Sequence, residues 1–165
     1  MSIVHYQLSI QKTMYSKEEL KQLKLEFWES FSYFCEVQPN LRHRKKMWVL
    51  YNTKVKGVEL KFDANRKGAS VIIEVNHRKE DERLEMFEKL TWYKEDLEKD
   101  FPEGLIWDIC YVLETGKQVA RIYLTKEGID MHRREHWGEF FTFMASQMYL
   151  LERNFMSIVE YIKEG

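Results

Sequence analysis

Hydrophobic residues recur every three or four positions in the first quarter of the chain. Ser16 and Glu19 precede them with the spacing of a capping box, in which two side chains satisfy free amides at the start of a helix. The pattern predicts an amphipathic helix that begins at Ser16 and ends before Pro39. Its apolar stripe consists of Leu20, Leu23, Phe27, Phe31, Phe34 and Cys35.

Alternation of apolar and polar residues predicts two β-hairpins further along the chain. Val58, Leu60 and Phe62 alternate with charged residues, residues 65–68 supply a turn, and Val71, Ile73 and Val75 alternate again. The second hairpin has the turn Thr115-Gly116 between two alternating sets: Leu105, Trp107, Ile109 and Tyr111, then Ala120, Ile122 and Leu124. Residues 47–52 are apolar and aromatic, which predicts one more strand.

Two further helices are expected. Residues 80–100 carry an apolar stripe and end before Pro102 and Gly104, so we predict one continuous helix there. Residues 134–163 predict a helix about 45 Å long at 1.5 Å per residue. One side of it can pack on a sheet, and the rest needs a partner or a bend. Its residues Trp137, Phe141, Met144, Met148, Leu151, Phe155, Ile158 and Ile162 form a heptad seam.

This order of elements is helix, three strands, helix, two strands and long helix. It predicts an α+β fold with a mixed or antiparallel five-stranded sheet and helices packed over the sheet. We expect one domain over residues 14–165, preceded by an N-terminal extension, residues 1–13. A doubly wound nucleotide-binding fold is excluded because strand–helix alternation and a Gly-rich phosphate loop are both missing.

Charge and composition narrow the class of protein. The 165 residues include 26 Lys and Arg and 27 Asp and Glu, a net charge of −1, so any charged partner must meet a local patch. Neither a signal peptide nor a membrane-spanning run is evident, so we expect a cytoplasmic protein with no membrane partner. Cys35 and Cys110 lie in apolar patterns, and we expect them to be reduced packing residues.

Two acidic residues form the first candidate site. Asp63 and Glu74 fall on one face of the first hairpin, where their carboxylates could share a divalent cation. The segment resembles the acidic motif of restriction-endonuclease-like nucleases, which usually place a basic residue two positions after the second acid. Here that residue is Asn76, which carries no positive charge. We therefore interpret the acids as solvated carboxylates, unless a lysine or arginine from elsewhere supplies the charge.

Two other clusters of residues are candidate binding sites. His132, Glu135 and His136 have the spacing of inverted zinc metallopeptidases, but no third ligand is evident and we interpret the match as accidental. A basic cluster near Trp48 is a candidate phosphate-binding site for nucleic acid, although a solvated loop is the commoner role of such residues. This cluster consists of Arg42, Arg44, Lys45 and Lys46.

Several short patches together resemble a bacterial family of domains of unknown function, family 4268. The resemblance extends from Met14 to about the C-terminus, and it implies that residues 1–13 are an extension. Members fused to restriction-associated domains suggest a link with nucleic acids, but the family implies no catalytic residue. The patches are residues 14–19, 26–31, 62–63, 73–77, 107–108 and 121–123, and Trp137.

The sequence therefore favours a non-enzymatic binding or regulatory module, with nucleic acid as a candidate partner and a homodimer formed through residues 137–162. The alternative is a nuclease that depends on Mg²⁺ or Mn²⁺, or an inactive relative of one, with Asp63 and Glu74 as metal ligands. No other cofactor is expected. The segment Glu74 to His77, which includes Asn76, is where we would look for a site first.

Overall fold

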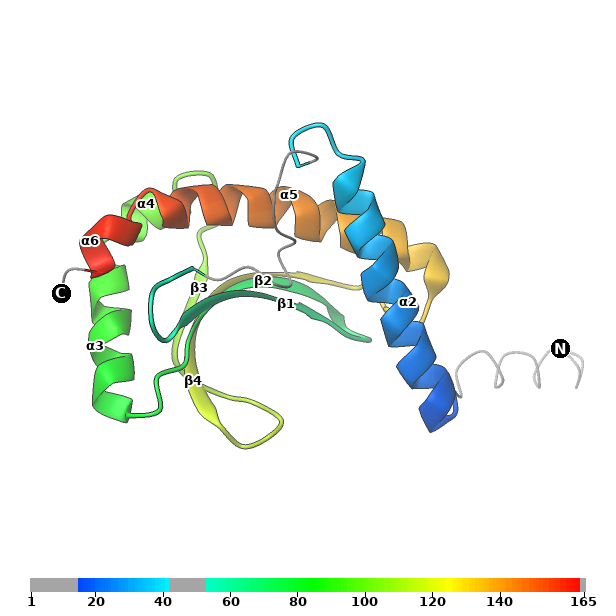
Figure 1. Ribbon diagram of the computed structural model, residues 1–165, viewed down its shortest axis with the longest axis horizontal. Helices are drawn as coiled ribbons and strands as arrows, with labels where there is room; N and C mark the ends of the chain where they lie inside the picture. The colour runs from blue at the N-terminus through cyan, green and yellow to red at the C-terminus, as the bar shows by residue number, and fades with distance from the viewer. Residues whose placement is uncertain (1–14, 42–52, 164–165) are drawn as a thin grey trace, which may run out of the picture.

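The computed structural model describes residues 15–41 and 53–163, and its centre is a curved antiparallel sheet (Figure 1). Two hairpins build it: β1 (Val58–Ala64) with β2 (Gly68–Val75), and β3 (Ile106–Val112) with β4 (Gln118–Glu127). The strand order β1-β2-β4-β3 places the two hairpins side by side through β2 and β4. The α+β class and both hairpins are confirmed.

The prediction of five strands is wrong, because the sheet has four strands in the part of the chain that the structure describes. The extra predicted strand, residues 47–52, lies outside the described residues. The β1 edge carries charged side chains at alternate positions, Glu59, Lys61 and Asp63, a feature that discourages pairing with a further strand.

The long helix α5 (Trp137–Met156) packs along one face of the sheet, and α2 (Lys17–Glu36) crosses α5 near the end of the β1–β2 hairpin (Figure 1). The core lies between these helices and the strands, and Phe31 of α2 reaches β1 through its contact with Phe62. Ser16 caps α2 as predicted, since its hydroxyl accepts the Glu19 N–H at 3.1 Å. Phe27 of α2 is fully buried, and the centres of four aromatic rings lie 5.0 to 5.4 Å from its own: Trp28, Trp137, Phe140 and Phe141.

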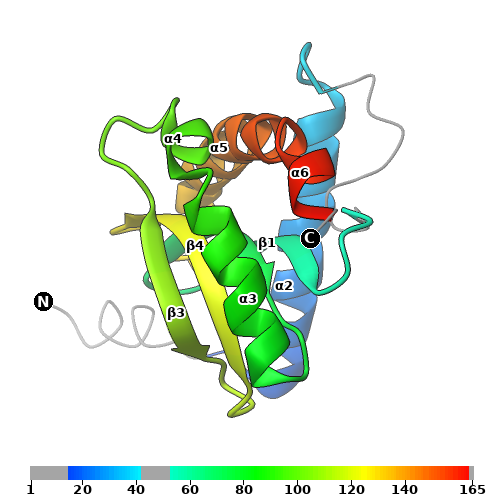
Figure 2. The same cartoon turned by 90° about the vertical axis from the view of Figure 1, so that its left-hand side faces the viewer.

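The helix predicted over residues 80–100 is two helices, α3 (Glu80–Thr91) and α4 (Lys94–Glu98). The chain turns at Trp92 and Tyr93, whose N–H groups donate to carbonyls only three residues back. The turn lets Tyr93 stack on Tyr161 while Leu97 of α4 becomes fully buried. Figure 2 shows α3 at the end of the sheet, beneath α4 and α6.

The predicted long C-terminal helix is also interrupted. It begins with a 3₁₀ turn, η2 (Arg134–His136), continues as α5, and bends before α6 (Val159–Lys163). At the bend the Ser157 hydroxyl donates to the Asn154 carbonyl at 2.6 Å, a contact that often bends helices. The bend buries Ile158, Val159 and Ile162 within the same chain.

The apolar seam of α5 is buried against the chain's own sheet and helices. The seam is therefore accounted for within one chain, and the dimer through residues 137–162 stays a prediction. Cys35 is half-buried, but Cys110 is exposed, so the prediction that Cys110 is a packing residue is wrong. Cys110 lies at a bulge in the edge strand β3, where the alternation is broken.

None of the described helices has the length and apolarity needed to cross a membrane.

Candidate ligand-binding cleft

The strand register places the two predicted acids on the concave face of the sheet, which we define as the face opposite α5. In the β1–β2 hairpin Asp63 pairs with Ser70, and Glu59 pairs with Glu74. Asp63 and Glu74 are therefore on the same face but are separated along the strands, because Glu74 lies four positions after Ser70, the partner of Asp63. Their separation leaves room for a third side chain between them.

That side chain is Arg121, which β4 places directly opposite Glu74. Its Nη1 donates to Asp63 Oδ2 at 2.9 Å, and its Nη2 lies 3.7 Å from Glu74 Oε1. The guanidinium carbon also lies 4.1 Å from the centre of the Tyr111 ring. Only 4% of Arg121 is exposed, so an arginine that is almost completely buried joins the two carboxylates.

Glu74 is more deeply buried than the sequence suggested, since only 1% of it is exposed. Its Oε2 accepts hydrogen bonds from Lys61 Nζ at 2.7 Å and from Asn76 Nδ2 at 3.1 Å. The interpretation of Glu74 as solvated is therefore wrong, because β2 is a central strand with both faces covered. Asp63, by contrast, remains partly exposed.

A positive charge accompanies the acids even though Asn76 carries none. Lys61 lies between Glu74 and Glu59, at 2.7 Å and 3.1 Å. Burial alone lowers the pKa of Lys61, but the hydrogen bonds and charges of Glu74 and Glu59 outweigh it and raise that pKa above its ordinary value. The neighbouring strand supplies the charge that the sequence motif lacks.

A cleft of about 570 Å³ opens at the Asp63 end of this network. Its walls come from α2, the β1–β2 turn, the β3–β4 hairpin and the segment at residues 131–132. Three cationic side chains line it, Lys24, Arg66 and Arg121, against two carboxylates, Asp63 and Glu114. With a neutral histidine, the ionised groups of the lining therefore carry a net charge of +1.

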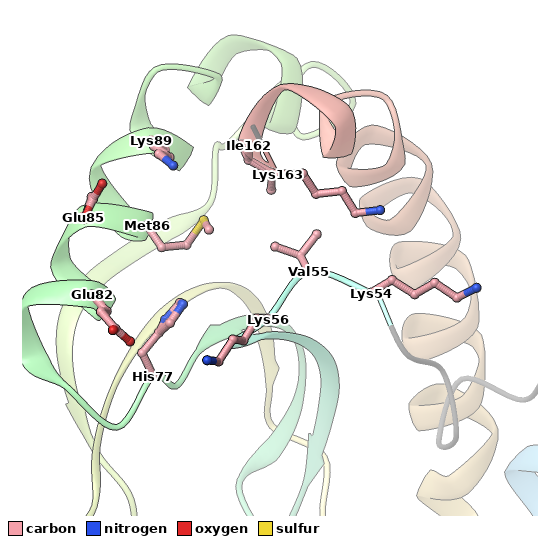
Figure 3. A pocket seen from close by; sticks show the side chains of 10 residues that line it. All are labelled: Lys54, Val55, Lys56, His77, Glu82, Glu85, Met86, Lys89, Ile162 and Lys163. Carbon is pink, nitrogen blue, oxygen red and sulfur yellow. The ribbon is translucent and has the colours of Figure 1, made fainter. Parts of the chain in front are cut away.

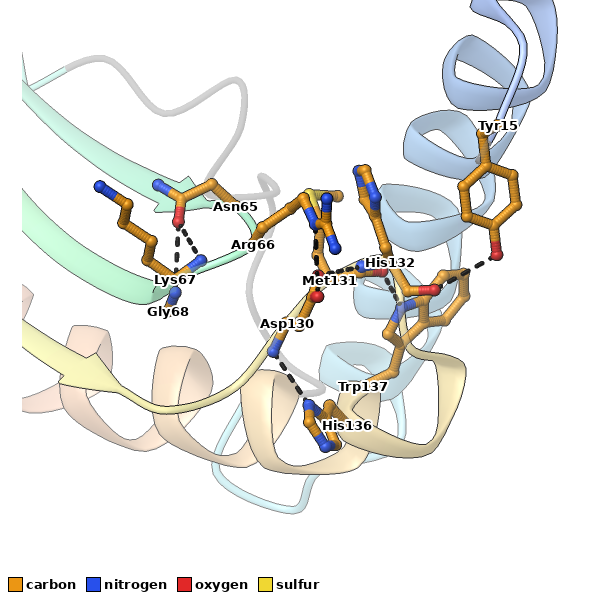
Figure 4. A network of polar contacts seen from close by, with 10 residues as sticks. All are labelled: Tyr15, Asn65, Arg66, Lys67, Gly68, Asp130, Met131, His132, His136 and Trp137. Carbon is orange, nitrogen blue, oxygen red and sulfur yellow. Dashed lines mark hydrogen bonds and ion pairs between the residues drawn. The ribbon is translucent and has the colours of Figure 1, made fainter. Parts of the chain in front are cut away.

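Polar contacts hold the rim of this cleft in place (Figure 4). Asn65 Oδ1 accepts the N–H groups of Lys67 and Gly68 at 2.8 and 3.2 Å, which fixes the β1–β2 turn. Arg66 Nε lies 3.4 Å from Asp130 Oδ2 across the gap. Asp130 Oδ1 in turn accepts the His132 N–H at 2.9 Å. The turn and the 130–132 segment are thereby tied together.

The pKa of His132 is lowered in this rim. Burial lowers the pKa of its imidazole, and the charges of Arg66 and Lys24 lower it further, while Asp130 opposes them. Its Nδ1 is buried and has no hydrogen-bond partner in the structure. Burial and the charges of Arg66 and Lys24 therefore favour the neutral form of this imidazole.

The histidine motif does not have the helical geometry that its spacing suggests. His132 lies before η2, and His136 Nδ1 accepts the Asp130 N–H at 2.9 Å, so one ring nitrogen of His136 is already occupied (Figure 4). Within residues 15–41 and 53–163, no group of three or more His, Cys, Asp or Glu side chains is arranged to hold a metal ion.

The remaining predicted site residues do not lie together in one site. Asn76 joins the network through Glu74, but His77 lies against Gly57 at a second cavity, away from Asp63. The basic cluster at residues 42–46 (Arg42, Arg44, Lys45 and Lys46) lies outside the described residues, and phosphate binding there stays a prediction.

Sequence reasoning missed Lys61, Arg121 and the rim residues Lys24 and Arg66. A signal for Arg121 exists, because it is a charged residue between Ala120 and Ile122 in a strongly alternating strand. Its contact with Glu74 depends on β2 pairing with β4, and local patterns do not specify which strands of different hairpins are neighbours.

The model for a domain of unknown function, DUF4268, matches residues 23–159, and the chain belongs to this family. Its description assigns the family no activity. Neither a curated protein nor a solved structure matches the chain. The similarity to restriction-endonuclease-like domains inferred from the acidic motif is not shown by these comparisons.

Proposed function

We propose that this domain is a non-enzymatic binding module whose cleft at Arg121 holds a small oxyanion, either a carboxylate or a phosphate group. The observation that carries the proposal is a guanidinium with 4% of its residue exposed at the wall of a cleft with excess positive charge. Arginine presents a planar set of N–H donors that suits carboxylate and phosphate groups.

Two carboxylates stabilise the buried guanidinium of Arg121. Asp63 and Glu74 balance its charge, and the Tyr111 ring packs on its flat face. Arg121 Nε is buried without a hydrogen-bond partner in the structure. A binding group fixed before the ligand arrives loses little conformational entropy on binding, which favours affinity. In this account Asp63 and Glu74 position Arg121 and are not metal ligands.

Isothermal titration calorimetry with inorganic phosphate and with succinate tests the proposal. Replacing Lys24 and Arg66 with Gln removes two lining cations without disturbing Arg121, and we expect binding to weaken at least tenfold. Lys67→Gln is the matched control, because Lys67 follows Arg66 but does not line the cleft. The proposal fails if neither anion binds wild-type protein, or if Lys67→Gln weakens binding as much as the double variant.

A Mg²⁺- or Mn²⁺-dependent nuclease is the second candidate function, and one contact favours it. Lys61 Nζ lies 2.7 Å from Glu74 and supplies the positive charge that such enzymes place beside the second acid. Incubating the protein with plasmid DNA and either metal ion tests this function. Cleavage that Asp63→Asn abolishes would support the nuclease, and a lack of cleavage would leave the acids as ligands of Arg121 only.

A further inference from the structure

A second cavity, also about 570 Å³, lies at the opposite end of the β1–β2 hairpin (Figure 3). Three segments distant in sequence meet there: the turn before β1, α3 and α6. Val55, Met86 and Ile162 are its apolar lining residues. Met86 is half-buried and gives most of the accessible apolar surface, because only 6% of Val55 and 1% of Ile162 is exposed. Figure 3 shows the Val55 and Met86 side chains extending into the cavity from facing walls. The cavity shares no lining residue with the Arg121 cleft.

The turn that carries Val55 is held by buried hydrogen bonds. The Thr53 hydroxyl donates to the Val58 carbonyl at 2.7 Å and accepts the Val55 N–H at 3.1 Å. The Asn76 N–H donates to the Gly57 carbonyl at 2.8 Å, which fastens the turn to the end of β2. This wall is therefore preformed.

Charge around the cavity favours an anion. Lys54, Lys56, Lys89 and Lys163 line it, against Glu82 and Glu85. Lys163 Nζ lies 4.0 Å from Glu160 Oε1, and Figure 3 shows the Lys54 and Lys163 side chains extending away from the cavity, so Lys56 and Lys89 are the cations that the argument uses. The described lining residues include no Phe, Tyr or Trp on which a nucleobase could stack. His77 lies between Glu82 and Lys56, and its Nδ1 is buried without a hydrogen-bond partner.

We propose that this cavity binds an aliphatic carboxylate. The hydrocarbon chain packs on Met86 and the exposed edge of Val55, where Met86 adapts its flexible side chain to the ligand. The carboxylate lies beside the ammonium groups of Lys56 and Lys89 at the rim. This site is independent of the proposed function of the Arg121 cleft and is tested separately.

The test is a titration of wild-type protein with acetate, hexanoate and octanoate, followed by NMR of the methionine methyl groups. We expect octanoate to shift the Met86 methyl signal and to bind roughly tenfold tighter than hexanoate, because two more methylene groups leave water. Acetate and inorganic phosphate should leave the signal unchanged. If octanoate leaves the Met86 signal unmoved, or binds no tighter than acetate, the proposal is wrong.

Charge reversal locates the site. Lys56→Glu and Lys89→Glu should each weaken octanoate binding at least fivefold, whereas Lys21→Glu on α2 makes the same charge change away from the cavity and should not. Equal loss in all three variants would contradict a site at this cavity. The Met86 signal in wild-type protein decides the matter if a variant fails to fold. The Lys24 and Arg66 variants should bind octanoate normally even if the Arg121 cleft binds no oxyanion.

Discussion

At the scale of single residues, a glycine determines how the end of β2 is built. Gly57 has a φ of +79°, a conformation that L side chains rarely adopt. A Cβ at this position would also lie 2.4 Å from the His77 ring, so the imidazole occupies the space that a side chain would need. The position of His77 in the second cavity therefore depends on Gly57.

Gly57→Ala should destabilise the fold by about 2 to 4 kcal/mol, because backbone strain and a steric clash add together. Gly116→Ala is the control, since Gly116 has a similar φ of +88° but nothing within 4 Å of its missing Cβ. It should cost only about 1 kcal/mol. Urea denaturation measures both variants. Equal losses would show that the clash with His77 contributes nothing.

At the scale of elements, the sequence predicted most of the fold and a partner or a bend for the C-terminal helix, but it did not predict the break at Trp92. Capping at Ser16 and the two alternating hairpins are local features, and the structure confirms these predictions. Neither the turn at Trp92 nor the bend at Ser157 lies at Pro or Gly. The Ser157 hydroxyl bond to the Asn154 carbonyl bends the chain locally. Both changes of direction also bury apolar residues, Leu97 and Ile158, and this tertiary gain is not visible in local patterns.

The same limit applies to the candidate site. Periodicity placed Asp63 and Glu74 on one sheet face, but it did not predict Arg121 between them, because that contact joins strands of different hairpins. Lys61 was overlooked for another reason: on an isolated strand its charge is indistinguishable from that of any solvated surface lysine.

The pairing of β2 with β4 predicts a large cost for removing Arg121. Arg121→Met leaves Glu74 buried with less compensation, and we expect a loss of about 3 kcal/mol in the free energy of unfolding. Glu74→Gln in the same chain should recover part of it. Arg153→Met is the control, because Arg153 forms a 2.8 Å ion pair with Asp100 but is 51% exposed, and its loss should be far smaller. Similar losses from Arg121→Met and Arg153→Met in urea denaturation would contradict a buried, structurally essential network.

At the scale of the whole molecule, the rim of the cleft makes stability depend on pH. The pKa of His132 in the folded chain lies below its ordinary value of 6.5, so the unfolded chain takes up this proton first as the pH falls. Stability should therefore decrease below about pH 6.5 and stop decreasing on this account once the folded pKa is passed.

His132→Gln should reduce this dependence, because glutamine does not titrate. Urea midpoints of wild type and variant at pH 7.5, 6.5 and 5.5 measure the difference, and the wild type should lose relative stability as the pH falls. Midpoints that change in parallel across this range would show that His132 does not contribute. The range stays above pH 5, where carboxylates begin to dominate.

The central claim is that the cleft beside Arg121 binds an oxyanion, and an NMR titration of His132 with and without phosphate tests it most directly. An anion bound near Lys24 and Arg66 offsets their charges, so phosphate should raise the pKa of His132 relative to chloride at equal ionic strength. In the variant that replaces Lys24 and Arg66 with Gln, phosphate should leave the pKa of His132 unchanged. A wild-type His132 whose pKa phosphate does not raise, or an equal rise in the double variant, would contradict the account.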